Sequence, residues 1–492
     1  MLESVIGTLN SWVWSPALIY LCLLVGLYFS LRTGFLQVRH FGEMIRLIRD
    51  GRSSNEGVSS FQALAMALAG RVGTGNIAGV ATALTFGGPG ALFWMWVVAF
   101  LGASTAFVES VLAQIYKEQD TEGRFVGGPA YYFEKGLGQK WYGLLFAAVA
   151  VVACGLLLPG VQANSIAGAM QTALGVEPWI TGAIVAAALG IIVIGGVKRI
   201  ASAAEIVVPF MAGAYILVSI IIIAMNIGQL PDMLALVFRS AFGAEAAFGA
   251  ITGKAVEWGV KRGVYSNEAG QGTGPHPAAA AAVSHPAKQG LVQAFSVYVD
   301  TLLVCSSTGF MLLITGLYNV QDPNDTGAYL YQGVAGVAAG PGHVQTAMEN
   351  IMPGIGATFV AVALLLFAFT TILAYYYIAE TNIRYLHRSM NALWALPVLQ
   401  LGAIGAVVYG SIRTADLAWA MGDLGVGLMA WLNITGILFL QKPALAALRD
   451  YEAQRRAGLD PVYNAEVAGV TNAPLWDEIR RRYRAEAAAQ QE

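Results

Sequence analysis

Long runs of apolar residues, separated by short polar connections, extend from near the start of the chain to about residue 440. A helix rises 1.5 Å per residue, so about 20 apolar residues cross the roughly 30 Å hydrocarbon core of a membrane. The pattern predicts an all-α integral membrane protein with 11 transmembrane helices. Their approximate bounds are 15–31, 59–85, 90–116, 141–172, 178–196, 203–226, 245–283, 288–318, 353–383, 390–411 and 415–440.

Two of these segments are interrupted by the same tripeptide, Gly-Thr-Gly, at residues 73–75 and 272–274. In hydrocarbon an unpaired backbone N–H or C=O group is costly, so a broken helix survives only where protein, water or a ligand satisfies these groups. Paired interruptions in corresponding positions of two halves indicate the binding site of a secondary transporter. The sequence therefore predicts a transporter whose site lies at the two breaks.

The order of the segments also predicts how the two halves are related. After the first helix, five expected helices at 59–226 are followed by five at 245–440, and each group begins with a Gly-Thr-Gly segment. A unit of five helices ends on the side of the membrane opposite to its start, so the second unit is inverted relative to the first. We expect one transmembrane transporter domain at 1–440 and a cytoplasmic tail at 441–492, formed by a solvated helix.

Composition agrees with a membrane protein, since 57% of the residues are hydrophobic and only 12% are charged, against about 25% charged residues in soluble domains. The sequence contains neither a nucleophile motif nor a clustered metal-ligand spacing, so an enzyme is not expected. The net charge of −2 gives no reason to expect a nucleic-acid partner. Cys22, Cys154 and Cys305 all fall within expected helices, so no disulfide is expected.

Lysine and arginine residues outside the expected helices are unevenly distributed. With the N-terminus outside, Arg239 and Arg413 lie on outer connections, whereas nearly all the others fall on inner connections or in the tail. This distribution follows the positive-inside rule. We expect a multi-pass protein of the plasma membrane, the inner membrane in bacteria, with a cytoplasmic C-terminus. The outer loop at 319–350 is either a passive connector or holds a short helix over an outer vestibule.

The first break gathers Gly70, Gly73 and Gly75 within six residues, directly before Asn76. If the helix unwinds here, a second half-helix starts near Asn76, and its free N–H groups and positive dipole end favour an anion such as a carboxylate. The carbonyl groups freed on the other side would offer hard oxygen ligands to a cation. The alternative is a small-residue packing stripe, but these glycines fall around much of the helix circumference.

The second break, from Ser266 to Pro275, combines hydroxyl, amide and glycine groups with prolines that remove backbone donors. Oxygens of Gln271, Gly272 and Thr273 would face a substrate ammonium group or a cation, opposite the first break. The alternative is an ordinary inner loop between two shorter helices. That alternative would change the helix count and disturb the charge distribution.

Several motifs carry a resemblance to known transporters. Residues 72–77, VGTGNI, resemble the unwound first core helix of LeuT-type amino-acid transporters. Residues 87–102, GGPGALFWMWVVAFLG, resemble the signature of the alanine or glycine:cation symporter family, also called sodium:alanine symporters, and residues 127–132 and 266–274 resemble the same family. The resemblance covers the whole membrane portion. It implies a LeuT-like five-plus-five inverted repeat with one extra N-terminal helix.

The resemblance also implies a function and a substrate site. The function is sodium-coupled symport of alanine, glycine or similarly small amino acids by alternating access, with sodium as the coupling ion and no other cofactor. In LeuT-like folds the amides after the first break hold the substrate carboxylate, which here implies Thr74 and Gly75, next to Gly73. The following residue, Asn76, is then a ligand of the ion or the substrate.

A sodium site is implied at Thr370 and Thr371. In LeuT-like folds two neighbouring hydroxyl residues on the equivalent helix bind sodium together with carbonyl groups from the first break, here those of Ala69 and Val72. Hard oxygens without a carboxylate suit a monovalent cation, because the substrate itself supplies compensating charge. From the residues alone, the alternative is that both threonines bond carbonyls four residues earlier in their own helix.

Ionisable residues inside expected helices are costly and therefore candidates for function. We expect them to form structural or gating pairs rather than to carry protons; they are Arg71, Glu109, Glu205, Glu268, Asp300 and Asp423. A proton-coupled carrier of the same fold is the first alternative, and one of these acids would then be its coupling group. An ion channel is a weaker alternative, because the polar groups cluster at two breaks. The expected partners are a small amino acid, sodium and the lipid bilayer, with no obligate protein partner.

Overall fold

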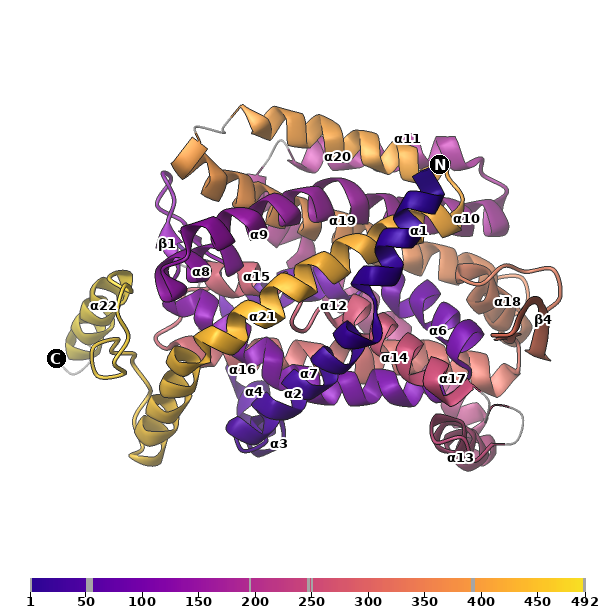
Figure 1. Ribbon diagram of the computed structural model, residues 1–492, viewed down its shortest axis with the longest axis horizontal. Coiled ribbons are helices and arrows are strands. Elements are labelled where there is room, and N and C mark those ends of the chain that lie inside the picture. Colours follow the sequence, from indigo (N-terminus) through magenta and orange to yellow (C-terminus); the bar gives the residue numbers. More distant parts are fainter. Residues whose placement is uncertain are drawn as a thin grey trace.

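The computed structural model describes residues 2–49, 56–193, 196–245, 248, 251–390 and 394–489 of the 492-residue chain. This part is mostly helical, with long helices packed side by side and two short hairpins, β1–β2 and β3–β4 (Figure 1). In chain order the elements, with η for π- or 3-10-helical turns, are α1 (Leu2–Val13), α2 (Pro16–Arg32), α3 (Leu36–Arg39), α4 (Phe41–Ile48), α5 (Ser60–Arg71), η1 (Gly75–Gly79), α6 (Val80–Gly87), α7 (Gly90–Ile115), β1 (Glu118–Gln119), β2 (Phe125–Val126), α8 (Pro129–Leu137), α9 (Lys140–Val152), η2 (Ala153–Leu157), α10 (Leu158–Leu174), α11 (Pro178–Val193), α12 (Gly196–Met225), η3 (Ile227–Gln229), α13 (Leu230–Ala241), α14 (Thr252–Asn267), α15 (Pro275–Ala280), α16 (Pro286–Val297), η5 (Tyr298–Cys305), α17 (Ser306–Thr315), β3 (Asn319–Asp322), β4 (Asp325–Gln332), α18 (Pro341–Ile351), α19 (Gly356–Met390), α20 (Ala395–Ser411), α21 (Ala415–Arg456) and α22 (Leu475–Ala489).

Within the described residues, six helices are long and apolar enough to span a membrane, and the bent pair of α1 and α2, at 41° to each other, gives a seventh. The chain is therefore a mostly helical, multi-pass membrane protein. The other expected spans correspond to the broken helices α5–η1–α6 and α14–α15 and to the shorter apolar helices α11 and α20. The count of 11 and the LeuT-like inverted repeat remain predictions.

The expected interruption of the first broken helix is confirmed. α5 begins with a capping box between Ser59 and Gln62, which satisfies its first backbone donors. It ends at Arg71, because Val72 leaves the helical conformation with ψ at 87°. The chain becomes helical again in the π-helical turn η1, which begins at Gly75.

The second broken helix is interrupted by three residues with positive φ angles. α14 ends at Asn267, and Glu268, Gly270 and Gly272 follow with φ angles of 58°, 83° and 87° before Pro275 opens α15. Glycine takes this left-handed conformation without steric cost, whereas a glutamate does so only where its surroundings fix it. The structure therefore does not support an ordinary inner loop, because the interrupted segment is buried throughout.

Helix α7 lies against both α14 and α16, while α5 lies against α12, α16 and α19. Small residues allow this close packing. A methyl group at Gly259 would come within 2.5 Å of Trp94 Cβ, and one at Gly263 would overlap Val98. The two breaks are enclosed as a result, since every residue at 69–76 and 263–274 is buried.

The outer loop contains a short helix, one of its two expected forms, whereas the tail differs from its expected form. The loop at 319–350 contains the short helix α18, but also the hairpin β3–β4, in which Val320 pairs with Tyr331. Helix α21 continues to Arg456, beyond the expected end at 440. The tail after it is not simply solvated, because Tyr463 and Trp476 are buried. These aromatic side chains pack against the transmembrane part. The sequence did not indicate this packing, because the tail is polar on average.

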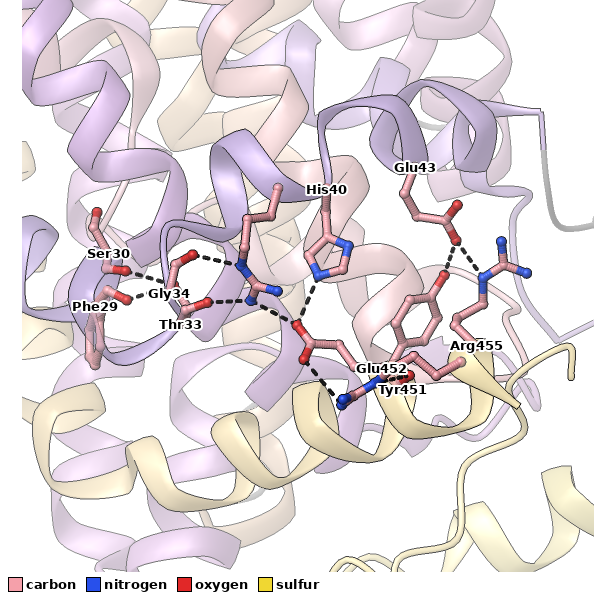
Figure 2. Close-up of polar contacts among 11 residues, drawn as sticks. Phe29, Ser30, Thr33, Gly34, His40, Glu43, Tyr451, Glu452 and Arg455 are labelled. Carbon is pink, nitrogen blue, oxygen red and sulfur yellow. Dashed lines mark hydrogen bonds and ion pairs between the residues drawn. The ribbon is translucent and has the colours of Figure 1, made fainter. Parts of the chain in front are cut away.

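The end of α21 is joined to the segment after the first span by a polar cluster (Figure 2). Glu452 accepts a hydrogen bond from Arg39 at 2.9 Å and lies 2.9 Å from the ring nitrogen Nε2 of His40. Arg39 also donates to the carbonyls of Thr33 and Gly34, at 2.7 and 2.6 Å. Helices α3 and α4 are thereby fixed to the last long helix.

Glu43, in the same cluster, gives the structure a dependence on pH. The hydrogen bond from Arg46 lowers the pKa of the Glu43 carboxyl from its ordinary 4.5 to about 2, and Tyr451 and Arg455 contribute. Because the folded state holds the ionised form, this stabilisation is present above pH 4.5 and is lost as the pH falls towards 2. Glu43→Gln should therefore lower the unfolding temperature at pH 7, and its difference from wild type should shrink below pH 4.5.

Thermal unfolding of the purified protein between pH 7 and pH 3 measures this effect. Glu3→Gln is the matched control, because Glu3 is exposed in the first turn of α1. A Glu43→Gln difference that stays constant over the whole pH range would contradict the prediction.

Candidate functional site

Two backbone donors of the first break are satisfied by side chains and not by the helix. The Gly73 N–H donates to Asn76 Oδ1 at 2.8 Å, and the Thr74 N–H donates to Gln162 Oε1 at 3.0 Å. The Thr74 hydroxyl has no hydrogen-bond partner among the described residues. The break thus presents N–H groups to buried oxygen acceptors, and a carboxylate is a stronger acceptor of the same kind.

Gln162, in α10, is the residue that the sequence analysis missed at the first break. It is buried, and its contact with Thr74 crosses 88 positions of the sequence. A single glutamine in an apolar helix gives no spacing or motif to detect. Only a search for every polar side chain within expected helices would have included it.

Asp300 lies where the two broken helices meet. Its carboxylate accepts hydrogen bonds from Asn76 Nδ2 at 2.6 Å, from the Ser266 hydroxyl at 3.0 Å and from the Thr301 hydroxyl at 2.7 Å. Asn76 belongs to the first break and Ser266 to the end of α14, while Asp300 itself is in the π-helical turn η5. Such turns are frequent at functional sites. Asp300 therefore ties Asn76 to the second broken helix.

Thr370 and Thr371 reach different partners. The Thr371 hydroxyl lies 2.8 Å from the carbonyl oxygen of Ala69 and 3.5 Å from that of Val72, in addition to a bond within α19. The Thr370 hydroxyl bonds carbonyls of its own helix. In a continuous helix the Ala69 carbonyl would accept from the Gly73 N–H, which here donates to a side chain. Ala69 therefore supplies a freed carbonyl, and Thr371 is the threonine that meets it.

Glu109 of α7 and Asn433 of α21 hold the second break. The Glu109 carboxylate accepts from the Gly270 N–H at 3.2 Å and from Asn433 Nδ2 at 2.7 Å, and the same Nδ2 lies 2.9 Å from the Gly270 carbonyl oxygen. The Gln271 side-chain amide has no hydrogen-bond partner within the described chain. As at the first break, a freed donor is satisfied by a residue of a distant helix.

Part of the second break faces the first. A methyl group at Gly75 would come within 3.2 Å of Ser266 Cα, and one at Gly274 within 2.6 Å of the Arg71 guanidinium. Gly272 is turned the other way, towards side chains of α8 and α9. Of the residues expected at the second break, Thr273 shares a pocket with the first break, whereas Gly272 faces away from it.

This pocket adjoins both breaks. Its wall includes Ala69 and Gly70 of α5, Glu268 and Thr273 of the second break, and Thr370 of α19, completed by apolar residues of α5, α12 and α19. The Thr273 hydroxyl donates to Glu268 at 2.8 Å. The pocket is therefore mostly apolar, with one carboxylate and the three hydroxyl-bearing side chains of Thr273, Thr370 and Tyr377 in its wall.

Arg71 and Glu205 bind the ends of α5 to its neighbours. Arg71 donates to the carbonyl of Gln293 at 3.1 Å and to the Ser296 hydroxyl, both in α16. Glu205 of α12 accepts from Gln62 at 2.9 Å. Neither contact is an ion pair, and the expected structural or gating pairs of these two residues stay a prediction.

Asp423 of α21 pairs with two cations of α14. Its carboxylate lies 2.8 Å from Lys261 Nζ and accepts two hydrogen bonds from Arg262, at 2.8 and 3.1 Å. The Arg262 guanidinium lies 4.4 Å from the centre of the Trp419 ring. The Trp14 indole N–H donates to the main-chain carbonyl of Asp423 at 2.8 Å, so the bent first helix is joined to the same cluster.

Asp423→Asn is expected to destabilise the protein by about 3–5 kcal/mol, because it leaves buried cations without their counter-charge. The exposed pair of Lys254 and Glu257, at 2.9 Å, provides the control. Glu257→Gln should cost no more than about 1 kcal/mol, since exposed ion pairs contribute little. Denaturant unfolding of both variants in detergent measures the difference. Equal losses would show that the Asp423 cluster does not stabilise the fold.

Groups of three or more His, Cys, Asp or Glu side chains that could hold a metal ion do not occur in the described ranges. A monovalent cation, however, is served by hydroxyl and carbonyl oxygens. The Thr371 hydroxyl and the freed Ala69 carbonyl are oxygens of this type. The residues present therefore fit a sodium ion better than a transition metal.

Comparisons with known proteins agree over nearly the whole chain. The sequence model of the sodium:alanine symporter family matches residues 1–465. A putative sodium/proton-dependent alanine carrier protein of Bacillus subtilis (strain 168) is 58% identical, over 96% of this chain and 97% of its own length. A sodium/proton-dependent alanine carrier protein of Bacillus sp. (strain PS3) is 52% identical, over 89% and 98%, and a probable sodium/glutamine symporter of Bacillus subtilis (strain 168) is 42% identical, over 95% and 94%.

Proposed function

Because the chain belongs to the sodium:alanine symporter family, we propose that it couples the uptake of alanine, and of glycine, to sodium by alternating access. The family and the relatives named above are transporters, which agrees with a protein that is not an enzyme. The apolar helices make it a multi-pass membrane protein. The LeuT-like inverted repeat, the outward N-terminus and the cytoplasmic tail are parts of this proposal.

The substrate carboxylate binds at the first break, at the N–H groups of Thr74 and Gly75. Support comes from the Thr74 N–H, which already donates to a side-chain oxygen of Gln162. The carboxylate takes the place of this oxygen, and the Gln162 amide then turns its NH2 donors towards the ligand. Asn76 keeps the Gly73 N–H satisfied while the site fills and empties, because Asp300 holds its amide in place.

The substrate ammonium group lies at the second break. Gln271 and Thr273 are proposed to supply side-chain oxygens there, and Gly272, whose Cα faces α8 and α9, is proposed to supply only its carbonyl oxygen. Thr273 is the best supported of the three, since it lines the pocket beside the first break. The amide of Gln271 has no other partner among the described residues, so it is free to turn towards a ligand.

The coupling sodium ion lies between α5 and α19, held by the Ala69 and Val72 carbonyls and by Thr371, with Thr370 as a further candidate. The observation that carries the proposed function is this junction. One unwound segment meets Thr371 through its freed carbonyl and Gln162 through its freed N–H. A cation and a carboxylate bound there lie within a few residues of each other, so each lowers the cost of burying the other.

Uptake of labelled alanine into proteoliposomes, with sodium, lithium, potassium or choline outside, tests this function. A sodium gradient should drive accumulation, and unlabelled glycine should compete while leucine should not. Glutamine belongs in the same competition series, because one relative is named a probable sodium/glutamine symporter. Uptake that is independent of the sodium gradient would contradict sodium coupling.

Proton coupling is the second candidate, since two relatives are named sodium/proton-dependent carriers. In that case alanine accumulation would follow a pH gradient without sodium. One of the buried carboxylates, such as Glu268 or Asp300, would then be the coupling group. Single-channel currents would indicate the channel alternative instead.

A further inference from the structure

The chain after α21 forms a strap, residues 457–489, across one end of the bundle. Tyr463 and Trp476 anchor it, and both are buried. The Tyr463 and Trp476 rings lie 5.1 Å apart in an edge-to-face arrangement. These two buried side chains therefore pack the strap against the rest of the protein.

The strap lies on a second feature, a clamp between residues 56–58 and residues 280–282. The Val58 N–H donates to the Ala280 carbonyl at 3.0 Å, and the Ala282 N–H donates to the Val58 carbonyl at 2.9 Å. Residues 56–58 directly precede α5, and residues 280–282 include the end of α15 and the chain after it. The clamp thus joins the start of α5 to the end of α15, which are the ends of these helices that lie away from the breaks.

The strap binds the α15 side of the clamp through main-chain contacts. The Ser284 hydroxyl donates to the Pro461 carbonyl at 2.8 Å, and the Tyr463 N–H donates to the Ser284 carbonyl at 2.9 Å. Asp460 forms an ion pair with Lys288 at 2.8 Å. The strap is therefore attached directly to the connection that follows the second broken helix.

Trp476 contacts the two residues whose side chains hold Ala281 in the clamp. Gln114 Nε2 and Lys117 Nζ each donate to the Ala281 carbonyl at 3.0 Å. The Trp476 indole N–H donates to the Gln114 carbonyl at 2.9 Å, and Lys117 Nζ lies 5.0 Å from the centre of its ring. Loss of the indole would remove a contact from each of these residues.

The strap also reaches the α5 side of the clamp. Arg482, in α22, forms an ion pair with Glu56. The Glu56 carbonyl accepts from the Phe125 N–H at 2.6 Å, which holds residue 56 in place. One short segment therefore contacts both halves of the clamp.

We propose that the strap holds the clamp closed. When the substrate path opens on the side of the membrane where the tail lies, the strap detaches and α5 separates from α15. Tyr463, Trp476 and Arg482 are positioning residues in this device. Their contacts exist only while the clamp is closed, so they bias the equilibrium towards the closed form. The inference rests on alternating access as proposed above, because only a transport cycle requires these ends to separate.

Cysteine labelling of Ala67→Cys tests the strap. Ala67 lines the pocket beside the first break, and the native cysteines are all buried, so the unmodified chain gives the background rate. With a maleimide, and without alanine or an ion gradient, Arg482→Glu and Glu56→Arg should each raise the labelling rate at least about threefold, because each shifts a two-state equilibrium towards the open form. Trp476→Ala should act in the same direction.

The charge swap Glu56→Arg with Arg482→Glu should return the rate to near that of Ala67→Cys alone, and Arg481→Glu on the exposed face of α22 should leave it unchanged. Unchanged rates in both single variants, or a swap that labels faster than either, would overturn the proposal. Unfolding temperatures separate a released strap from a misfolded protein. If the variants label at the expected different rates but the wild-type protein takes up no alanine, the proposed transport function is contradicted and the proposed role of the strap is not.

Discussion

The substitution Gly73→Ala should lower sodium-dependent alanine uptake by about 5- to 140-fold, since an overpacked methyl group costs about 1–3 kcal/mol and 1.4 kcal/mol is a factor of ten. A methyl group at this position would overlap the Thr371 hydroxyl and lie 3.0 Å from Gln162 Oε1. Both are the residues through which the first break meets its neighbours. The loss should appear in the transport rate and in the sodium dependence together.

The control for this experiment is Gly168→Ala. Gly168 lies in α10, the helix of Gln162, and a methyl group there meets nothing within 4 Å. Its uptake should equal that of the wild type. Both proteins must be compared at equal amounts in the liposomes, with unfolding temperatures as a check on folding. Normal uptake by Gly73→Ala would show that the unwound segment is not the binding site.

Thr371→Ala should raise the sodium concentration needed for half-maximal alanine uptake at least about tenfold, because a hydrogen-bonding group lost to a charged partner costs about 1.5–3 kcal/mol. The Thr371 hydroxyl is the one that meets the freed Ala69 carbonyl. The maximal uptake at saturating sodium should change much less, since the substrate contacts at Thr74 remain. Uptake measured against sodium concentration separates the two parameters.

Thr370→Ala is the matched control, because it removes the same group one residue earlier in the same helix. The Thr370 hydroxyl bonds carbonyls of α19, and it lines the pocket without reaching α5 through a hydrogen bond. Its sodium dependence should shift by no more than about threefold, the cost of a weak local hydrogen bond. Equal shifts in both variants would indicate that both hydroxyl groups bind the ion, as the family resemblance implies.

The two breaks are stabilised by a common device. Each has a freed N–H group that donates to a carboxylate or amide of a distant helix: Thr74 to Gln162 and Gly270 to Glu109. Asp300 and Glu109 come from the helical segments that follow the second and the first broken helix, respectively. Through Asp300, which holds Asn76, and through Glu109, each break also has a partner from the opposite half of the chain, whereas Gln162 lies in the same half as Thr74. This explains how two interrupted helices remain stable in a buried environment where unpaired donors are costly.

The sequence alone was sufficient for the features that depend on local chemistry. Segment length and apolarity predict membrane helices, because a bilayer requires about 20 apolar residues from each. Glycines and prolines at 70–75 and 270–277 predict where the helices break, because they permit or force a non-helical backbone. Both breaks were found in the expected segments.

Only the tertiary structure decided which side chains satisfy these breaks and where the tail packs. The partners of Thr74, Asn76 and Gly270 lie 88, 224 and 161 positions away in the sequence. The buried face of the tail likewise depends on Trp476 meeting a carbonyl 362 positions earlier. No local pattern encodes such pairs, because they arise from the way the helices pack. A polar residue in an apolar helix looks the same in the sequence whether its side chain faces a break or bonds the backbone of its own helix.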